Sequence, residues 1–148
     1  MRGALALAGL LVAGCSSTTG ETSSPDAAPS GEVSFKSDVV PILAARCATS
    51  ACHGNKENNL GVHLITSDPA AVYTELQRES PTATGAKFIV AGDPAKSFFY
   101  AKIEGTQDDF SSNCLIPGCG ETMPPGTKLP GESRETIRRW IAEGAKNN

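Results

Sequence analysis

The feature that most constrains this chain is a pair of cysteines followed directly by a histidine, in the run CATSACH at residues 47–53. Two thiols ahead of a histidine are typical of covalent haem attachment, where the common spacing is C-x-x-C-H. Because the porphyrin fixes the positions of the two vinyl groups, the two additional residues must bulge outward, and all four loop residues are small. The run predicts one haem c held by Cys47 and Cys52, with His53 as an axial ligand of the iron.

A methionine in a stiff loop supplies a second candidate iron ligand. Met123 lies in the run GETMPPG at residues 120–126, and the chain has no other methionine apart from Met1. A thioether opposite a histidine favours reduced iron and raises the reduction potential. The two prolines lock their own φ angles and would hold the sulfur in place. Although a lone methionine is commonly core filler, its place in a Pro/Gly loop predicts that Met123 is the distal ligand.

The N-terminus resembles that of an exported lipoprotein. Arg2 precedes an apolar run over residues 4–13 that is too short to be a membrane-spanning helix. The run ends in LVAGC, and small residues ahead of a cysteine resemble the lipobox of bacterial lipoproteins. That resemblance implies cleavage after Gly14 and acylation of Cys15, which would anchor a periplasmic or outer-membrane lipoprotein to a lipid membrane. An ordinary secretory signal with an incidental cysteine is the alternative, and in both cases the domain is exported.

The expected signal divides the chain into three parts. Residues 1–14 are the signal peptide, and residues 15–31 are the lipidated cysteine and a tether rich in Ser, Thr, Gly and Pro. A segment without large apolar side chains cannot bury a core, so we expect the tether to be disordered. Residues 32–148 remain for one domain, which is within the size of a single core. The formal charge of the chain is −3 and it has no basic block, so we expect no nucleic-acid partner.

Hydrophobic periodicity predicts an all-α, loop-rich domain. The first helix is expected from about Ser37, or from Ser34, as far as the first cysteine of the run, with Ser37 or Asp38 as its cap. Three more helices are expected at residues 69–78 after an Asp68 cap, at residues 94–103 after an Asp93 cap, and at residues 131–144. Loops rich in Gly, Pro, Asn and Ser fill the remainder.

The order of these features resembles a class I c-type cytochrome. A helix, the Cys…Cys-His run, short helices, a Met-Pro loop and a final helix with Trp140 follow one another over nearly all of the domain. Three phrases resemble a bacterial subgroup often found in exported lipoproteins: DVVPIL at residues 38–43, GDP at residues 92–94 and WIAEGA at residues 140–145. The resemblance implies a small helical domain wrapped around one haem, with the two cysteines, His53 and Met123 in the roles given above. The four-residue gap between the cysteines departs from the family pattern.

Two further cysteines repeat the spacing of the first pair. Under the haem interpretation Cys114 and Cys119 are left over, and a disulfide that clips the loop presenting Met123 is the simplest outcome. The alternatives are a tetrahedral zinc site made by all four cysteines of the domain, or an exported binding domain held by two disulfides. Both alternatives leave His53 unexplained. His63 lies in an alternating stretch, so we expect it to face solvent and regard it as the weaker candidate for a sixth ligand.

These features favour an electron carrier over an enzyme. Two protein ligands on one iron leave no open position for a substrate, and no Ser/His/Asp set or phosphate-binding loop is evident. The adjacent pair Asp108 and Asp109 is more typical of a solvated turn than of a general-acid site. We therefore expect a membrane-tethered monohaem protein that takes one electron from a redox protein and passes it to another outside the cytoplasm.

Overall fold

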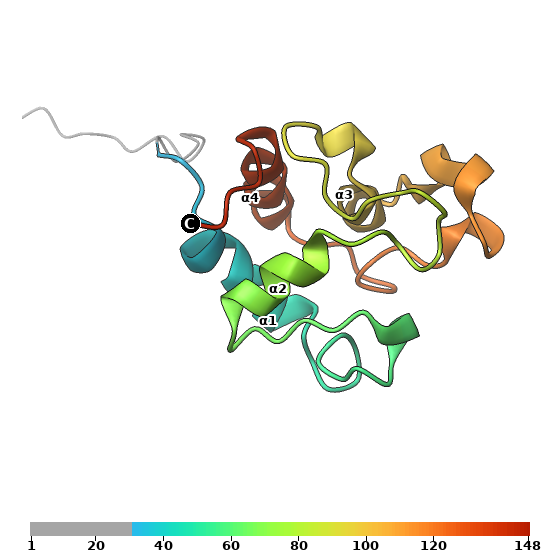
Figure 1. Ribbon diagram of the computed structural model, residues 1–148, viewed down its shortest axis with the longest axis horizontal. Coiled ribbons are helices and arrows are strands. Elements are labelled where there is room, and N and C mark those ends of the chain that lie inside the picture. The colour runs from blue at the N-terminus through green and yellow to red at the C-terminus, as the bar shows by residue number, and fades with distance from the viewer. Residues whose placement is uncertain (1–30) are drawn as a thin grey trace, which may run out of the picture. The chain divides into compact units, whose positions relative to one another are not determined.

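Four α-helices and five other helical segments carry the chain through Gly31–Asn148, the part that the computed structural model describes (Figure 1). The α-helices are α1 (Val40–Arg46), α2 (Pro69–Leu76), α3 (Phe98–Glu104) and α4 (Gly131–Ala142). The other segments are the π-helix η1 (Phe35–Val39) and the 3-10 helices η2 (Asn59–Gly61), η3 (Pro94–Lys96), η4 (Gln107–Asn113) and η5 (Pro117–Cys119). Since residues 31–148 contain isolated bridges but no sheet, the predicted all-α, loop-rich class is confirmed. The predicted signal peptide and Cys15 lie outside the described residues.

None of the helices in the described part of the chain is long and apolar enough to cross a membrane. The longest α-helix is α4, with 12 residues. Loops and single turns connect the helices, and the helices pack on one shared core. That core and the site described below are built by helix ends and loops as much as by helix faces.

The first helix begins after Ser34, earlier than the predicted caps. Ser34 Oγ accepts a hydrogen bond from Ser37 N at 3.2 Å, and Asp38 Oδ2 accepts one from Ser34 N at 2.7 Å. This reciprocal pair caps η1 at Ser34. The earlier of the two predicted starts is therefore confirmed, whereas Ser37 and Asp38 take part in the cap without being the cap residue. Pro41 lies in the first turn of α1, which continues directly from η1. α1 then delivers the chain directly to Cys47.

Aspartate caps α2 as predicted, whereas the third predicted helix is broken. Asp68 Oδ1 accepts hydrogen bonds from two N–H groups of the first turn of α2, at 3.1 and 3.2 Å. Residues 94–103 form η3 and then α3, because Ser97 between them has an extended conformation. The buried hydroxyl of Ser97 donates to Asp93 O at 2.9 Å and accepts from Val90 N at 2.9 Å. These bonds tie Ser97 to the preceding turn and interrupt the helix that periodicity predicted.

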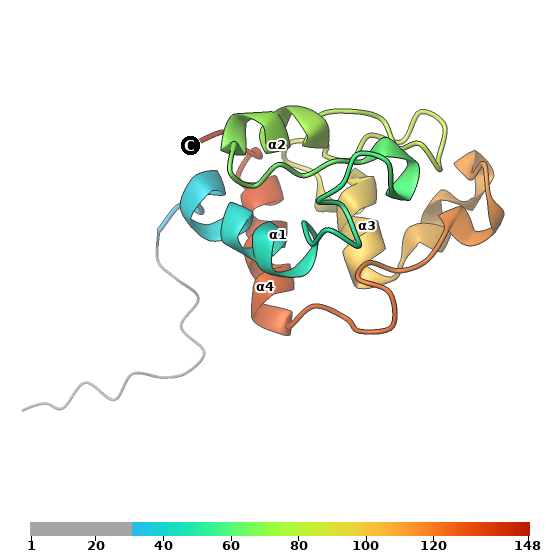
Figure 2. The same ribbon diagram turned by 90° about the horizontal axis from the view of Figure 1, so that it is seen from below.

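The two ends of the described chain meet in the core. Trp140 of α4 stacks on Phe35 of η1 with ring centroids 5.0 Å apart. Phe35 also meets Tyr73 of α2 edge-on at 5.5 Å. Figure 2 shows α1 and α4 at one end of the unit and the orange segment with η4 and η5 at the other. The aromatic cluster of Phe35, Tyr73 and Trp140 therefore lies at the end away from η4 and η5.

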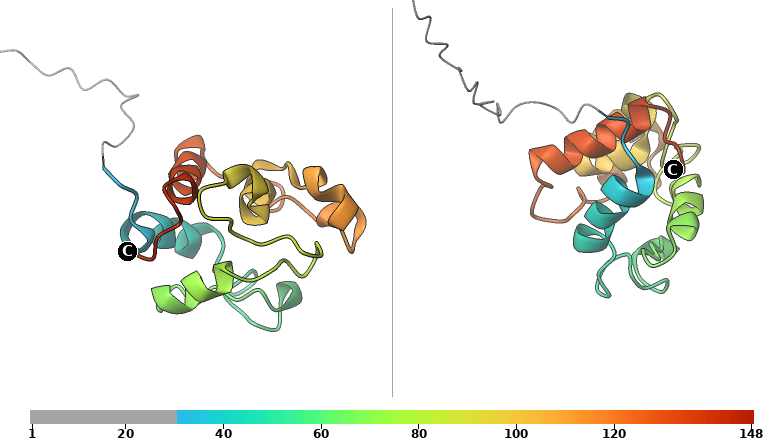
Figure 3. Two further views of the ribbon diagram at one scale, coloured as in Figure 1. Left: turned by 45° about the horizontal axis from the view of Figure 1, so that its top comes forward. Right: turned by 90° about the vertical axis from the view of Figure 1, so that its left-hand side faces the viewer.

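Two groups of chain segments face each other across the site that is described below. The teal segment that follows α1 and the green helix α2 lie on one side, and α3 with η4 and η5 lies on the other (Figure 3). The first side contains the Cys-His run and the second leads into the loop of Met123. The fold thus brings the two predicted halves of the site to one place.

Candidate cofactor site

A largely apolar cavity of about 360 Å³ lies between these two sides. Its volume is within the range of small-molecule and cofactor pockets. The apolar part of its wall comes from α2, α3 and the loops around them and includes Leu64, Leu76, Phe88, Phe98, Phe99 and Ile103. Most of these side chains are buried, so a ligand held among them would be shielded from water.

The imidazole of His53 is oriented by a backbone carbonyl. His53 Nδ1 lies 3.1 Å from Val62 O, and because a carbonyl can only accept, Nδ1 is the donor in this pair. A neutral imidazole then keeps its lone pair on Nε2, which is left to bind a metal. The backbone of the residue is also fixed, since Leu64 N donates to His53 O at 2.7 Å. His53 lines the cavity, so the predicted proximal ligand stands at an apolar pocket in a tautomer suited to the role.

Met123 borders the same cavity from a distant part of the sequence. Its N–H donates to Lys102 O at 2.9 Å, which fastens the methionine loop to α3. The side chain is half-buried in the cavity wall. The structure therefore places His53 and Met123, which the sequence assigns as a pair, at the wall of one cavity.

The loop from Cys47 to His53 is held by its own backbone. His53 N donates to Cys47 O at 3.0 Å, and Cys52 N donates to Thr49 O at 2.9 Å. Cys47 lines the cavity, and burial, with a smaller contribution from Cys52, raises the pKa of the Cys47 thiol to about 11. Cys52 is half-exposed and lies outside the cavity wall. Both cysteines are free thiols. Of the two predicted attachment points, Cys47 lines the cavity and Cys52 does not.

Gly54 is a site residue that the sequence analysis missed. A Cβ at this position would lie 2.8 Å from Thr49 O and closer still to Ala48 O. These are backbone atoms, which cannot move aside as the end of a flexible side chain can. Gly54 N also donates to Thr49 O at 2.9 Å and so closes the loop between the cysteines. A glycine directly after the Cys…Cys-His run was the available signal, since glycine permits a close backbone approach.

Replacing Gly54 by alanine is expected to distort the Cys-His loop and to lower the free energy of unfolding by about 1–3 kcal/mol. The cause is the collision of the new Cβ with backbone oxygen atoms of the loop. Urea denaturation measures the loss, and the haem content of the purified protein reports on the loop itself. Gly131→Ala is the matched control, because a Cβ there would come no nearer than 3.9 Å to a flexible arginine side chain. Equal midpoints for the two variants would contradict the prediction.

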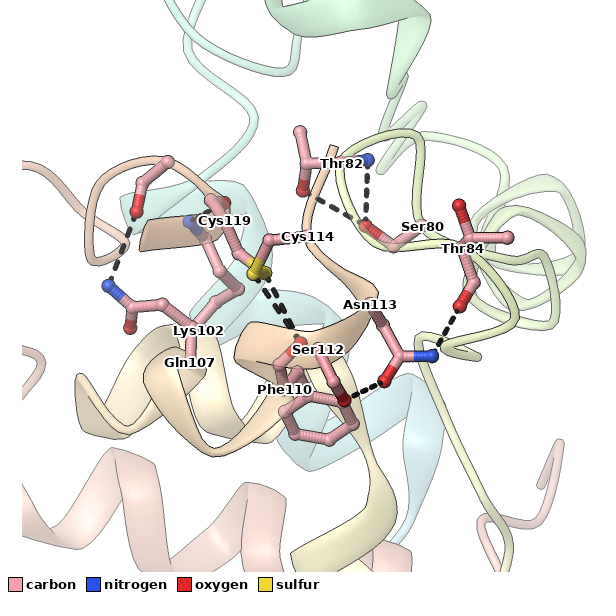
Figure 4. The surroundings of a disulfide bond; sticks show 11 residues. Ser80, Thr82, Thr84, Lys102, Gln107, Phe110, Ser112, Asn113, Cys114 and Cys119 are labelled. Atoms are coloured by element: carbon pink, nitrogen blue, oxygen red, sulfur yellow. Dashed lines mark hydrogen bonds between the residues drawn. A yellow bond between two sulfur atoms is a disulfide. The ribbon is translucent and has the colours of Figure 1, made fainter. Parts of the chain in front are cut away.

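The structure joins Cys114 and Cys119 as a disulfide, with Cα atoms 4.8 Å apart. This is the pairing that the sequence predicts, and the separation is within the usual range for a disulfide. Gln107 Nε2 donates to Gly120 O at 3.3 Å and Lys102 Nζ donates to Cys119 O at 3.0 Å (Figure 4). The disulfide and these two side chains fasten the segment that leads to the methionine loop.

Lys102 interrupts the apolar stripe of α3 and is nevertheless buried, with 8% of its surface exposed. Its ammonium group lies 5.9 Å from the centre of the Phe98 ring. Burial lowers the pKa of Lys102, and the negative charge of Glu121 opposes this shift. Because Lys102 also belongs to the cavity wall, the site contains a positive charge that the sequence analysis did not identify.

The arrangement of the other candidate residues does not favour the alternatives. In residues 31–148 no group of three or more His, Cys, Asp or Glu side chains could hold a metal ion, so the four-cysteine zinc site is not assembled. A domain with two disulfides would need Cys47 bonded to Cys52, and both are free thiols. His63 is half-buried and is not part of the cavity wall, which leaves Met123 as the candidate opposite His53.

Comparison with known proteins identifies no relative of this chain. No protein-family model, curated protein or solved structure matches it. The functional conclusion therefore depends on the cavity and on the nitrogen and sulfur atoms at its wall.

Proposed function

We propose that this protein is a monohaem c-type cytochrome that carries single electrons between redox proteins outside the cytoplasm. The observation that carries the proposal is that His53, Met123 and Cys47 all border one apolar cavity. Histidine nitrogen and methionine sulfur are the axial pair of the electron-transferring cytochromes c. The Cys47 thiol in the same wall provides a group for covalent attachment, and Cys52 follows it in a Cys…Cys-His run whose gap is two residues longer than the usual one.

Residues of this chain would set the properties of the cofactor. A bound haem would supply a one-electron iron couple. The bond from His53 Nδ1 to Val62 O fixes the ring and makes Nε2 a stronger base. The sulfur of Met123 favours reduced iron, and the apolar wall limits the access of water. Because protein side chains would take both axial positions, no position would remain for a substrate, which supports electron transfer rather than catalysis.

A spectrum of the full chain, produced in a host that exports it and attaches haem, tests this function. We expect a pyridine haemochrome of the c type and haem-dependent peroxidase staining that persists on a denaturing gel. Acid–acetone extraction should leave the colour with the protein. Complete loss of colour on extraction would contradict the proposal, and stoichiometric zinc in a colourless protein would favour the zinc alternative.

We also propose that acylation of Cys15 anchors the protein at a membrane. The support is the LVAGC run and the Ser/Thr/Gly/Pro-rich segment after it. A Cys15→Ala variant that is still exported should appear in the soluble fraction with the haem spectrum of the wild type. Retention of that variant by membranes, as strong as that of the wild type, would show that the anchor is something else.

A further inference from the structure

Lys102 is the one Lys or Arg side chain among the described residues that line the cavity. The side chain is buried, with 8% of its surface exposed. An ammonium group has three N–H donors, and the hydrogen bond found for Lys102 is the one from Nζ to Cys119 O. Its donors therefore exceed its protein acceptors, although Glu121, an exposed residue, also belongs to the cavity wall.

No described carboxylate neutralises this charge directly. The ion pairs of residues 31–148 do not include Lys102, although Glu121 lies near enough to influence it. Glu121 is exposed, so water rather than Lys102 can solvate its carboxylate. A buried charge without a partner is costly, and such charges are normally paired or hydrogen-bonded. The site thus favours a ligand that brings an anionic oxygen to Lys102.

We infer that Lys102 binds a carboxylate of the ligand in this cavity, which for haem is a propionate. The inference rests on the proposed function, because haem is apolar except for its iron and its two propionates. A charge-assisted hydrogen bond from Nζ would use the spare donors of Lys102 and would set how the ring sits in the cavity. The backbone oxygen of Lys102 holds Met123 N, so one residue of α3 would contact both the methionine loop and the cofactor.

Resonance Raman spectroscopy of the haem-loaded protein tests this contact through the propionate bending band. In Lys102→Met we expect that band to move to lower frequency, because methionine fills similar space and cannot donate a hydrogen bond. Lys102→Arg should keep a charged donor and shift the band much less than methionine does. Lys128→Met is the matched control, since Lys128 is an exposed lysine paired with Glu104 and lies outside the cavity wall, and it should leave the band unmoved.

The outcomes separate this inference from the proposed function. A wild-type protein without haem would show no haem bands at all, and the proposed function would then have failed. If the wild type binds haem and both Lys102→Met and Lys102→Arg keep its propionate band unchanged, the contact is overturned. Lys102 would then only hold the loop of Met123. If Lys102→Met does not fold, Lys102→Gln decides: the neutral amide removes the charge and weakens the hydrogen bond, so a band identical to that of the wild type contradicts the inference.

Discussion

Replacing both Cys47 and Cys52 by alanine is expected to abolish haem retention on a denaturing gel. Detergent would unfold the protein and break the proposed bonds from iron to His53 and Met123, whereas the proposed thioether bonds are covalent and would persist. Haem staining of the denatured protein should fall from one haem per chain in the wild type to none. Each single variant should keep one thioether and show a shifted haemochrome maximum, because one vinyl group stays conjugated with the ring.

The second cysteine pair provides a matched control with the same spacing. Cys114→Ala with Cys119→Ala removes two cysteines that have four residues between them, as in the first pair, but these form the disulfide in the structure. That double variant should keep its covalent haem. Haem staining that survives the loss of Cys47 and Cys52, or that disappears with Cys114 and Cys119, would contradict the assignment of the attachment points.

Replacing Met123 by leucine is expected to open one face of the iron and to lower its reduction potential. Leucine has nearly the volume of methionine and keeps the wall apolar, so the main change is the loss of the sulfur. The potential should fall by a few tenths of a volt, within the range of ~0.8 V that axial ligands span. The reduced variant should also bind carbon monoxide rapidly, whereas the wild type should not. Potentiometric titration and the absorption spectrum under carbon monoxide measure the two effects.

A second variant and a histidine control make this result specific. Met123→His restores a ligand, so it should block carbon monoxide and still have a low potential. His63→Gln changes the other histidine of the domain, which is outside the cavity wall, and should behave as the wild type. If Met123→Leu keeps the wild-type potential while His63→Gln lowers it, the distal ligand has been assigned to the wrong residue.

Helix positions could be predicted where their causes are local. Asp68 and the proline after it lie beside the N–H groups that they cap, so the start of α2 follows from a few adjacent residues. The break at Ser97 could not be predicted, because it depends on bonds to Val90 and Asp93 that exist only in the folded loop. The cap at Ser34 could be predicted only in part. Ser37 and Asp38 in the same turn also have side-chain oxygens that can cap a helix, so the sequence leaves the choice among the three residues open.

The residues that would bind the cofactor could be predicted better than the groups that hold those residues in place. Histidine and methionine are rare in this chain, His53 directly follows a cysteine, and Met123 precedes two prolines. Both residues border the cavity. The partner of His53 is the backbone carbonyl of Val62, which any residue type could supply, so no sequence signal marks it. The burial of Lys102 follows from packing of α3 against the methionine loop, which periodicity alone does not describe.

The bonds between the two ends of the described chain have a consequence for maturation. Asn148 supplies acceptors for the start of η1, at 2.8 Å from Phe35 N and 3.1 Å from Lys36 N, and Phe35 and Asn148 are 113 positions apart. If the domain is exported as proposed, a chain that emerges N-terminus first forms these contacts only after nearly the whole domain has emerged, because contacts of long sequence separation form late. In that interval Cys47 and Cys52 would belong to an unfinished chain. Under the proposed function, haem can therefore be attached to an open polypeptide before late closure of the domain buries Cys47.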